Sequence, residues 1–453
     1  MKQLPAVERK LCLVVFVFVV CAACACEGYR AVLFLSLSLL FAGKCVLLAT
    51  FSLPLSPEIE TTNHMLLSEL IQRRDKIRDI MFKEGIDAAL IATNVNLIYT
   101  FGQVVSGYLY LPLQAPARLF VKRPASLSGE HILPIRKPEQ LPELLAQCGL
   151  PMPKRLMLEG DELSFNEYQR LSACFPGTEV LACGSRIIRQ ARSVKTLWEI
   201  ETFRRSAQAH AAAYSHIPQL FQEGMTDLQL SIEVERAMRQ QGCLGIFRVF
   251  GQSMEIFMGS LLTGDNAQEA SPYDFALGGK GVDGSIPGGA CGHTMQRGES
   301  VMVDMGGNFY GYMCDMSRVY SVGKLPQRAY DAHQCCLDIQ QEVTEVARPG
   351  VSCEQLYQLA ADRVEKAGFA DCFMGTKQQA KFIGHGIGLE INEAPVLAPR
   401  IKQELEPGMV FALEPKIVLP GVGPVGIENS WVVTAEGVEK LTTAPEEIID
   451  LLS

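Results

Sequence analysis

The hydrophobic and polar positions along the chain separate an apolar beginning from a longer part with regular periodicity. From Met65 the sequence LLSELIQRRDKIRDIMFKEG carries apolar residues at helical spacing and ends at Gly85, which predicts an amphipathic helix. The sequence DAALIATNVNLIYTFG then predicts a buried strand followed by a short helix. Strand and helix patterns continue to alternate, so residues 65–190 are expected to form a small α/β domain.

The remaining segment, 191–453, begins with helices and then becomes rich in strands and glycine. A long amphipathic helix is predicted from Thr196, and Thr226 has the side chain of an N-cap for the helix that follows it. Two further helices are predicted near 326–347 and 352–367, between segments with strand character. The order of elements predicts a protein of the mixed α/β (α+β) class with two domains.

The first 64 residues have a different composition. Residues 11–26 carry no charge, and a second apolar tract runs from Ala31 to Leu55 with an interruption at Lys44. The first tract is shorter than the roughly 20 residues that a membrane-spanning helix prefers, and its basic flank resembles a signal peptide.

Three interpretations of the apolar extension, residues 1–64, stay open. It is a membrane anchor, an export signal, or an upstream extension of the reading frame with translation starting at Met65. The third is favoured, because charged and periodic sequence begins abruptly at Met65. It predicts a cytoplasmic protein, and membrane association is expected only if residues 11–55 are retained.

Composition and charge narrow the possible functions. Hydrophobic residues make up 48% of the 453 positions and charged residues 20%, which excludes a wholly disordered chain. The net charge of -9 argues against nucleic acid as the main partner, because proteins that bind it usually carry a basic surplus. The 15 cysteines are scattered, which favours reduced thiols in a cytosolic protein.

A candidate metal site begins with two aspartates in the sequence ESVMVDMGGNFYGYMCDMSRVYSV. This segment predicts two strands joined by a tight loop. A loop centred between Phe309 and Tyr310 would place Asp304 opposite Asp315, with Cβ atoms about 4.5–5.5 Å apart. Two facing carboxylates repel unless a cation or a proton lies between them. The alternative is a pair of surface aspartates at a strand end.

A second hairpin with two carboxylates is predicted in MVFALEPKIVLPGVGPVGIENSWVVT, residues 409–434. A turn centred on Val422 would pair Glu414 with Ser430 and make Glu428 the diagonal neighbour on the same face. Both glutamates stand among apolar strand residues, where an unpaired carboxylate is costly. Two hairpins that present carboxylates in this way favour a shared cation site.

A histidine completes the set in the sequence FIGHGIGLEINEAP, where glycines flank His385. A phosphate-binding loop is the competing interpretation, but no Lys-Ser/Thr pair accompanies these glycines. Four carboxylates and one imidazole suit hard or borderline divalent cations, and they carry enough charge for two of them. A two-metal site can clamp a substrate oxygen and deprotonate a water near neutral pH.

Together these motifs resemble the peptidase family M24, the pita-bread fold of methionine aminopeptidase, aminopeptidase P and prolidase. The matching sequences are VDMGGNFYGYMCDMSR, GHGIGLEINEAP, FALEP and GIENS. Residues 65–190 resemble the creatinase-type N-terminal domain of aminopeptidase P and prolidase, which methionine aminopeptidases lack. The resemblance therefore implies a pita-bread metallohydrolase domain at 191–453, and it also implies a homodimer.

The resemblance implies a role for each ligand. Asp304 would bind one metal ion and His385 the other, while Asp315 and Glu428 would bridge both. Glu414 would bind one metal ion and accept the proton of the nucleophilic water. Manganese is the expected metal, with cobalt, zinc or iron as alternatives.

Three expected substrate-binding positions depart from the family pattern. Asn392 stands seven residues after His385, where family peptidases carry another histidine, and it is also a candidate catalytic residue. Gly288 stands where they have a histidine after proline, with His293 nearby but displaced. Gly426 replaces an arginine of prolidase-like members.

The expected function is that of a dinuclear-metal-dependent hydrolase resembling Xaa-Pro aminopeptidase or dipeptidase, with an altered substrate shell. Its expected substrate is a small peptide or a small amide. The alternatives are a non-peptidase hydrolase or lyase of small molecules, or a catalytically weakened binding protein, because a fold does not determine a function.

Overall fold

The computed structural model describes the chain except for residues 1–31, 42–43, 55–56, 252–253 and 256. The chain divides into two compact units, Met1–Ile71 and Gln72–Ser453. Because the first apolar tract, 11–26, lies outside the described residues, the interpretations of that tract stay predictions.

In the first unit the second apolar tract forms two antiparallel strands, β1 (Val32–Phe41) and β2 (Lys44–Pro54). The helix predicted from Met65 is present but begins earlier, as α1 (Pro57–Glu84), and it continues into the second unit. Among the described residues, no helix combines the length and the apolar character needed to cross a membrane.

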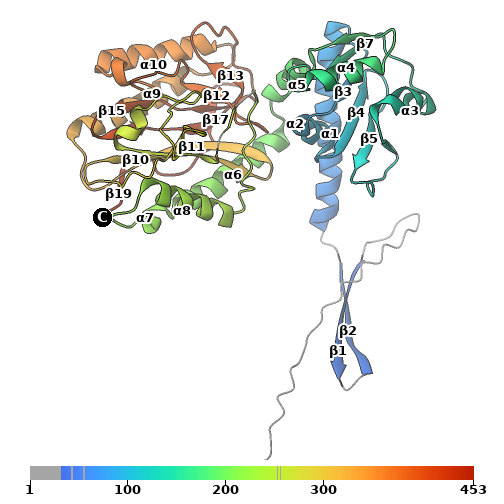
Figure 1. Ribbon diagram of the computed structural model, residues 1–453, viewed down its shortest axis with the longest axis horizontal. Helices are drawn as coiled ribbons and strands as arrows, with labels where there is room; N and C mark the ends of the chain where they lie inside the picture. Colours follow the sequence, from blue (N-terminus) through green and yellow to red (C-terminus); the bar gives the residue numbers. More distant parts are fainter. Residues whose placement is uncertain (1–31, 42–43, 55–56, 252–253, 256) are drawn as a thin grey trace, which may run out of the picture. The chain divides into compact units, whose positions relative to one another are not determined.

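The second unit begins with the predicted α/β domain (Figure 1). Its sheet has the strand order β6-β5-β4-β3-β7-β8 in the described residues. The strands are β3 (Ala88–Ile91), β4 (Ser106–Pro112), β5 (Arg118–Arg123), β6 (Ile132–Pro134), β7 (Arg155–Leu158) and β8 (Glu179–Leu181). The helices are α2 (Asn94–Phe101), η1 (Pro138–Gln140), α3 (Leu141–Gln147), α4 (Phe165–Ala173) and α5 (Gly184–Ser193). The predicted buried strand is β3, all of whose residues are buried, and the predicted short helix is α2.

Three helices follow: α6 (Leu197–Tyr214), α7 (Ile217–Leu220) and α8 (Asp227–Gln240). The sequence predicts α6 and α8, whereas α7 is an additional short helix. The hydroxyl oxygen of Thr196 accepts a hydrogen bond from the backbone N–H of Glu199, and the Glu199 carboxylate accepts one from the Thr196 backbone N–H. Thr226 and Gln229 form the same reciprocal cap on α8. The predicted N-cap Thr226 is confirmed, and Thr196 is a second N-cap that the sequence analysis did not name.

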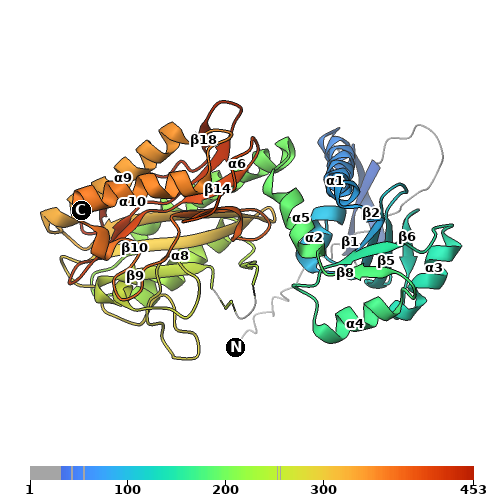
Figure 2. The ribbon, with the colours of Figure 1, turned by 90° about the horizontal axis from the view of Figure 1, so that it is seen from above.

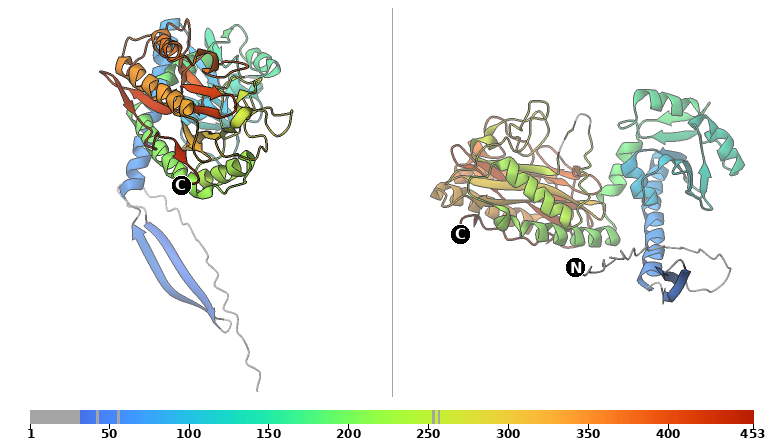
Figure 3. Two further views of the ribbon diagram at one scale, coloured as in Figure 1. Left: turned by 90° about the vertical axis from the view of Figure 1, so that its left-hand side faces the viewer. Right: turned by 60° about the horizontal axis from the view of Figure 1, so that its bottom comes forward.

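The rest of the second unit is built from strands enclosed by helices (Figures 2 and 3). Helix α6 packs on β10 and β11, and α9 packs on β15 and β16. The strands are β9 (Gly259–Thr263), β10 (Ser300–Phe309), β11 (Tyr312–Ser321), β12 (Gly384–Gly386), β13 (Glu393–Leu397), β14 (Val410–Leu413), β15 (Lys416–Leu419), β16 (Gly423–Gly426), β17 (Asn429–Val433), β18 (Val438–Lys440) and β19 (Ile449–Asp450). The helices are η2 (Gly264–Gln268), α9 (Gln327–Val346), α10 (Cys353–Ala367) and η3 (Ala370–Cys372). The described strands pair in the orders β19-β11-β10-β9, β13-β12-β14-β17-β18 and β15-β16.

The aspartate hairpin forms as predicted, but its predicted register is wrong. Asp304 pairs with Ser317, and Asp315 pairs with Gly306. The turn residues are Tyr310–Gly311, whose φ angles of 52° and 86° suit a two-residue hairpin turn with both central residues left-handed. The centre of the turn therefore lies one residue later than expected. Because this moves the register by two positions, both aspartates stay on one face of the sheet.

The predicted register of the glutamate hairpin is wrong in the opposite direction. Ser430 pairs with Ala412 and not with Glu414. The turn is centred on Gly421, whose φ of 74° is left-handed, one residue earlier than expected. Continuation of the observed register places Glu414 opposite Glu428, between the β14–β17 and β15–β16 ladders. The two glutamates are thus closer partners than the sequence indicated.

We expect a truncated variant that starts at Met65 to fold like the full chain. The residues of α1 that pack in the core of the second unit, Ile77 and Met81, are fully buried and remain in this variant. The midpoint of thermal unfolding, followed by near-ultraviolet circular dichroism, should be unchanged. As a control for the sensitivity of the assay, Ile77→Ala should lower the free energy of unfolding by about 2–5 kcal/mol. A Met65 variant that aggregates or melts earlier would show that residues 1–64 are structural.

Candidate metal centre

The five predicted ligand side chains lie together in the second unit. Asp304 comes from β10, Asp315 from β11 and His385 from β12. Glu414 follows β14 directly, and Glu428 directly precedes β17. The two hairpins and the short strand β12 therefore supply all five groups, from segments up to 124 residues apart in the sequence.

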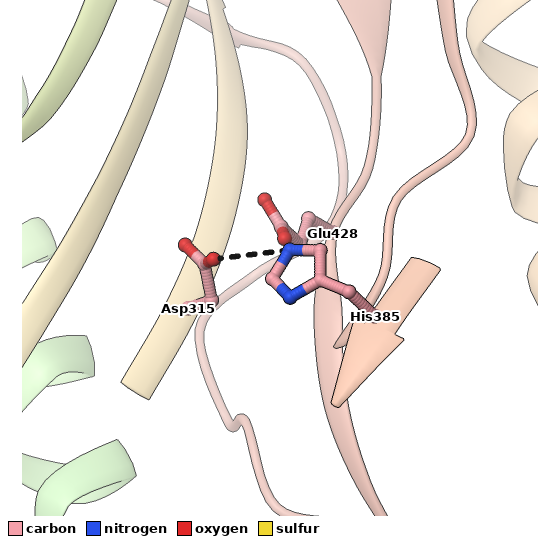
Figure 4. Close-up of side chains that lie close together, drawn as sticks. All are labelled: Asp315, His385 and Glu428. Carbon is pink, nitrogen blue, oxygen red and sulfur yellow. Dashed lines mark ion pairs between the residues drawn. The ribbon is translucent and has the colours of Figure 1, made fainter. Parts of the chain in front are cut away.

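The five residues form two overlapping groups whose ligand atoms lie within 4.8 Å of one another. The first group contains Asp315, His385 and Glu428, and Figure 4 shows the two carboxylates directed toward the imidazole ring. The second contains Asp304, Glu414 and again Glu428. The Nε2 atom of His385 lies 3.6 Å from Oδ2 of Asp315 and 3.3 Å from Oε1 of Glu414, which brings the two groups into direct contact.

The glycines beside His385 are required by the strands that pack against it. A Cβ atom on Gly384 would lie 2.3 Å from the carbonyl oxygen of Ala412, and one on Gly386 would lie 2.2 Å from that of Ala394. Neither distance is sterically allowed, so any side chain would push β12 away from β13 and β14. These glycines thus hold the backbone of His385 between two strands, and they form no phosphate-binding loop.

Burial and like charge shift the proton affinities of the ligand groups. Burial raises the pKa of Asp315 to about 7, although the nearby His385 partly offsets the effect. Burial and the neighbouring Asp315 raise the pKa of Glu428 well above its usual value. Burial alone would lower the pKa of His385, but its hydrogen bond with Glu414 outweighs that effect and raises the value to about 9. The groups hold protons tightly because their negative charges lack compensation, and a cation would supply it.

One buried carboxylate oxygen provides a direct test of fit for a metal ion. Oε2 of Glu428 accepts a hydrogen bond of 2.6 Å from the hydroxyl of Ser317. Oε1 of Glu428 is buried and has no hydrogen-bond partner among the described residues. Such an atom is costly unless something binds it. A divalent cation beside Asp315 and His385 would satisfy it, so the donor set fits a metal ion.

The structure also brings into the centre a residue that the sequence analysis missed. Lys416, the first residue of β15, has no exposed surface. Its Nζ atom lies 2.7 Å from Oδ2 of Asp304, 2.6 Å from Oε2 of Glu414 and 3.5 Å from Oε2 of Glu428. Although burial opposes its charge, these carboxylates raise the pKa of Lys416 well above its usual value. The signal was present in FALEPK, since a lysine two residues after Glu414 in an apolar strand points to the same face.

A cavity of about 530 Å³ opens onto the centre. Asp304, Asp315, His385 and Glu414 line it, whereas Lys416 is not among the described residues that do so. Much of the remaining wall is aromatic or aliphatic. It includes Phe247, Val249, Phe250, Phe257, Phe275, Leu277, Ile286, Phe382 and Ile391. Its volume and its apolar wall with a few polar groups are typical of a small-molecule site.

Asn392 lines the cavity, but its amide group is already engaged. Its Oδ1 accepts a hydrogen bond from the backbone N–H of Phe250, and its Nδ2 donates one to the carbonyl oxygen of Phe250, both at 2.7 Å. The guanidinium of Arg189 donates to the backbone carbonyl of Asn392 and lies over the Phe250 ring at 3.9 Å from its centroid. Asn392 therefore holds one wall of the cavity in place, a role that the sequence did not indicate.

The other two departures from the family pattern lie in different surroundings. Gly288 lines the cavity, and among the described residues a Cβ atom there would contact only Phe275, at 3.4 Å. Gly426 is not among the described residues that line the cavity, and it pairs with Lys416 across β15 and β16. A Cβ on Gly426 would lie 2.4 Å from the carbonyl oxygen of Pro415, so the observed backbone excludes a larger side chain.

A buried ion-pair network supports the segment that carries Asn392. Glu393 lines the cavity, and both Arg192 and Lys195 donate hydrogen bonds to its carboxylate. These cations outweigh the effect of burial and lower the pKa of Glu393 to about 2. Arg192 also binds Glu390 at 2.8 Å and the side-chain oxygen of Asn96 at 2.9 Å. Since breaking a buried pair leaves an uncompensated charge, this segment is held firmly.

We expect Asp315→Asn and Glu428→Gln to weaken binding of a divalent cation by at least about 100-fold, the upper end of the loss seen for residues that only support a ligand. Each variant replaces an anionic ligand by a neutral amide, and Glu428 belongs to both groups. Titration calorimetry with Mn²⁺ would measure the change, with the exposed Glu447→Gln as a matched control. Full occupancy in the Asp315 or Glu428 variant would contradict the assignment.

Comparison with known proteins agrees with the expected family and fold. The family model for metallopeptidase family M24 matches residues 201–435, and the model for the creatinase/prolidase N-terminal domain matches residues 73–194. Similar proteins include the uncharacterized peptidase YqhT of Bacillus subtilis (strain 168), which is 25% identical over 387 residues, or 83% of this chain and 99% of that protein. The Xaa-Pro dipeptidase of Pyrococcus horikoshii is 24% identical over 378 residues, or 83% of this chain and 97% of that protein.

Solved structures share the fold. The X-Pro aminopeptidase from Thermotoga maritima MSB8 has a TM-score of 0.68 at 23% identity and covers 83% of this chain and 99% of its own. The Xaa-Pro dipeptidase from Bacillus anthracis has a TM-score of 0.69 at 24% identity, with 84% and 99% covered. The mixed α/β class with a pita-bread domain is therefore confirmed. Because the M24 model alone spans more than half of the chain, the protein belongs to metallopeptidase family M24 and carries the creatinase/prolidase N-terminal domain.

Proposed function

We propose that this protein is a metal-dependent hydrolase that cleaves an amide bond in short peptides, of the Xaa-Pro aminopeptidase or dipeptidase type. The observation that carries the proposal is the convergence of four carboxylates and His385 beside a cavity of about 530 Å³, which Asp304, Asp315, Glu414 and His385 line. Family membership supports a hydrolase, and the names of relatives such as the Xaa-Pro dipeptidase of Pyrococcus horikoshii support a peptide substrate. Manganese is the proposed metal, and a homodimer is the proposed assembly.

In the proposed reaction Glu414 would accept the proton of the attacking water. A bound divalent ion would polarise the scissile carbonyl and lower the pKa of an attacking water. Glu414 faces the cavity, and although burial opposes its ionisation, Lys416 and His385 hold its pKa at about 2, so it is ionised near neutral pH. An ionised carboxylate can accept a hydrogen bond from a water molecule and orient it for attack. Glu414 is therefore the proposed proton acceptor.

The substrate shell differs from that of an ordinary prolidase. Gly288 has no side chain, and the amide of Asn392 already holds the backbone of Phe250. Neither position therefore offers a free side-chain donor to a developing oxyanion, and loss of one such donor typically costs about 10²–10³ in rate. Slow hydrolysis of standard X-Pro dipeptides is the consequence.

The charges in the cavity favour a peptide without a free C-terminal carboxylate. Among the described residues that line it, the basic side chains are Arg189 and His385, and Arg189 is already engaged with Glu390 and Asn392. Acidic residues on the wall, such as Glu255 and Asp274, would repel a substrate carboxylate and attract an amino group. The proposed substrate therefore has a free amino terminus and an amidated or extended C-terminus.

A second candidate is a hydrolase or lyase of small molecules that are not peptides. The same two features favour it, since Gly288 and the engaged Asn392 leave the centre without the side-chain donors expected to handle a peptide bond. A binding protein with weakened catalysis is the third alternative. A screen of the metal-loaded protein against X-Pro dipeptides, longer X-Pro peptides and small amides separates these three functions.

We expect the manganese-loaded protein to hydrolyse Ala-Pro-amide with a kcat/KM about 10–100-fold higher than that for Ala-Pro. This ratio corresponds to the free energy of one hydrogen bond to a charged group, about 1.5–3 kcal/mol, which the carboxylate of Ala-Pro would lack in this cavity. Product release, measured by chromatography, gives both constants, and metal-free protein is the control. Turnover of Ala-Pro at an ordinary enzyme rate, about 1–10³ s⁻¹, would contradict this prediction.

We expect Gly288→His to raise kcat for Ala-Pro-amide, by at most about 10²–10³, because it restores a donor of the missing type. Among the described residues, a Cβ atom at this position would contact only Phe275, at 3.4 Å. Gly288→Ala is the matched control, since it adds a Cβ atom without a donor and should leave kcat unchanged. An equal effect of both substitutions would show that Gly288 acts through packing.

A further inference from the structure

We propose that the ammonium group of Lys416 takes the place of one of the two cations expected for this fold, so that each subunit binds a single divalent cation through Asp315, His385 and Glu428. The inference rests on the proposed function, because it concerns the metal content of the same site. It revises the expectation of two cations, which considered the five ligands without Lys416.

The first argument is that Lys416 and a metal ion would occupy the same space. The Nζ atom lies 2.7 Å from Asp304 and 2.6 Å from Glu414, and these residues with Glu428 form the second ligand group. Divalent cations lie about 2.0–2.6 Å from carboxylate oxygens in proteins. A cation bound to the same oxygens would therefore lie almost on top of the ammonium, and the two positive charges exclude each other.

The second argument is that Lys416 has no alternative place for its charge. Its neighbours along and across the hairpin, Ile417, Val418 and Val425, are fully buried members of a hydrophobic cluster. An ammonium turned away from the carboxylates would enter this apolar region without hydrogen-bond acceptors, at a large cost in free energy. The side chain therefore stays with Asp304 and Glu414.

The strands themselves direct the lysine into the centre. Lys416 lies two residues after Glu414, so strand alternation places both side chains on one face. Its cross-strand partner is Gly426, which contributes no side chain that could fill the space. The backbone around Gly426 excludes a larger side chain. The pairing of Lys416 with Gly426 is therefore a consequence of how the β15–β16 hairpin is built.

The third argument is that the first ligand group remains free for one ion and faces the cavity. Asp315 and His385 line the cavity, and Oε1 of Glu428 has no hydrogen-bond partner among the described residues. Oε2 of Glu428 is already shared between Ser317 and Lys416. One unsatisfied oxygen beside one imidazole and one carboxylate suits one cation.

The balance of charge agrees with this arrangement. The four carboxylates, if all ionised, carry four negative charges, and two divalent cations would neutralise them completely. The buried ammonium of Lys416 would then lack a counter-charge. One divalent cation together with Lys416 leaves one negative charge in the centre and no unpaired positive group, which is the less costly state.

The decisive experiment counts metal ions. The full-length wild type, Lys416→Ala and the exposed control Lys402→Ala are dialysed against Mn²⁺ and then against metal-free buffer, and their content is measured by plasma mass spectrometry. We expect one ion per subunit in the wild type and the control, and two in Lys416→Ala. Electron paramagnetic resonance should show an isolated Mn²⁺ ion in the wild type and a spin-coupled pair in Lys416→Ala. Two ions in the wild type, or one in both proteins, would overturn the inference.

A second variant decides the question if Lys416→Ala does not fold. In the proposed arrangement Asp304 binds the ammonium and not the metal, so Asp304→Asn should keep one Mn²⁺ per subunit. In a two-metal arrangement Asp304 is a ligand, and the same variant should fall from two ions to one. A wild type that binds no divalent cation would overturn the proposed function together with this inference, whereas a wild type with two ions overturns the inference alone.

Discussion

The repulsion among four carboxylates within one small, largely buried space is the constraint on which the centre of this protein depends. Asp315, Glu414 and Glu428 are almost fully buried, and Asp304 is only partly exposed. Buried negative charges at such distances are unstable without positive partners. The carboxylates therefore need cations or protons beside them, and the chain supplies one cation itself as Lys416.

The fold meets this constraint through glycines, which let the strands that carry the charged side chains pack closely. Gly384 and Gly386 allow β12 to lie tightly between β13 and β14, which brings His385 to the carboxylates. Gly426 on the facing strand has no side chain that would clash with Lys416. The backbone hydrogen bonds of the sheets then hold these positions, and preorganisation of this kind lowers the cost of binding.

The cavity beside the candidate ligands has a wall that buried contacts hold in place. The aromatic wall is fixed by Asn392, which binds both backbone polar groups of Phe250, and by the buried pairs of Arg192 with Glu390 and Glu393. Asn392 is therefore part of a fixed wall, and it belongs to neither candidate ligand group.

The elements of the fold were largely determined by local sequence. Helical periodicity predicted α6 and α8, and the cap Thr226 marked the start of α8, because these signals act within a few residues. The five candidate ligand residues could also be predicted from sequence, since carboxylates and histidine are conspicuous in apolar, glycine-rich strands. Strand alternation alone then put the ligands of each hairpin on one face, even though both predicted registers were wrong by two positions.

Tertiary structure decided what the local signals could not. The register depended on which residues adopt left-handed angles at the turns, Tyr310–Gly311 in one hairpin and Gly421 in the other, and packing selects among several candidates there. The role of Asn392 depended on Phe250, which is 142 residues away in the sequence. The contact of Lys416 with Asp304, which belongs to the other hairpin, is visible only in the tertiary structure. Contacts between distant segments are set by how the sheets pack, and a pattern within one segment carries no information about them.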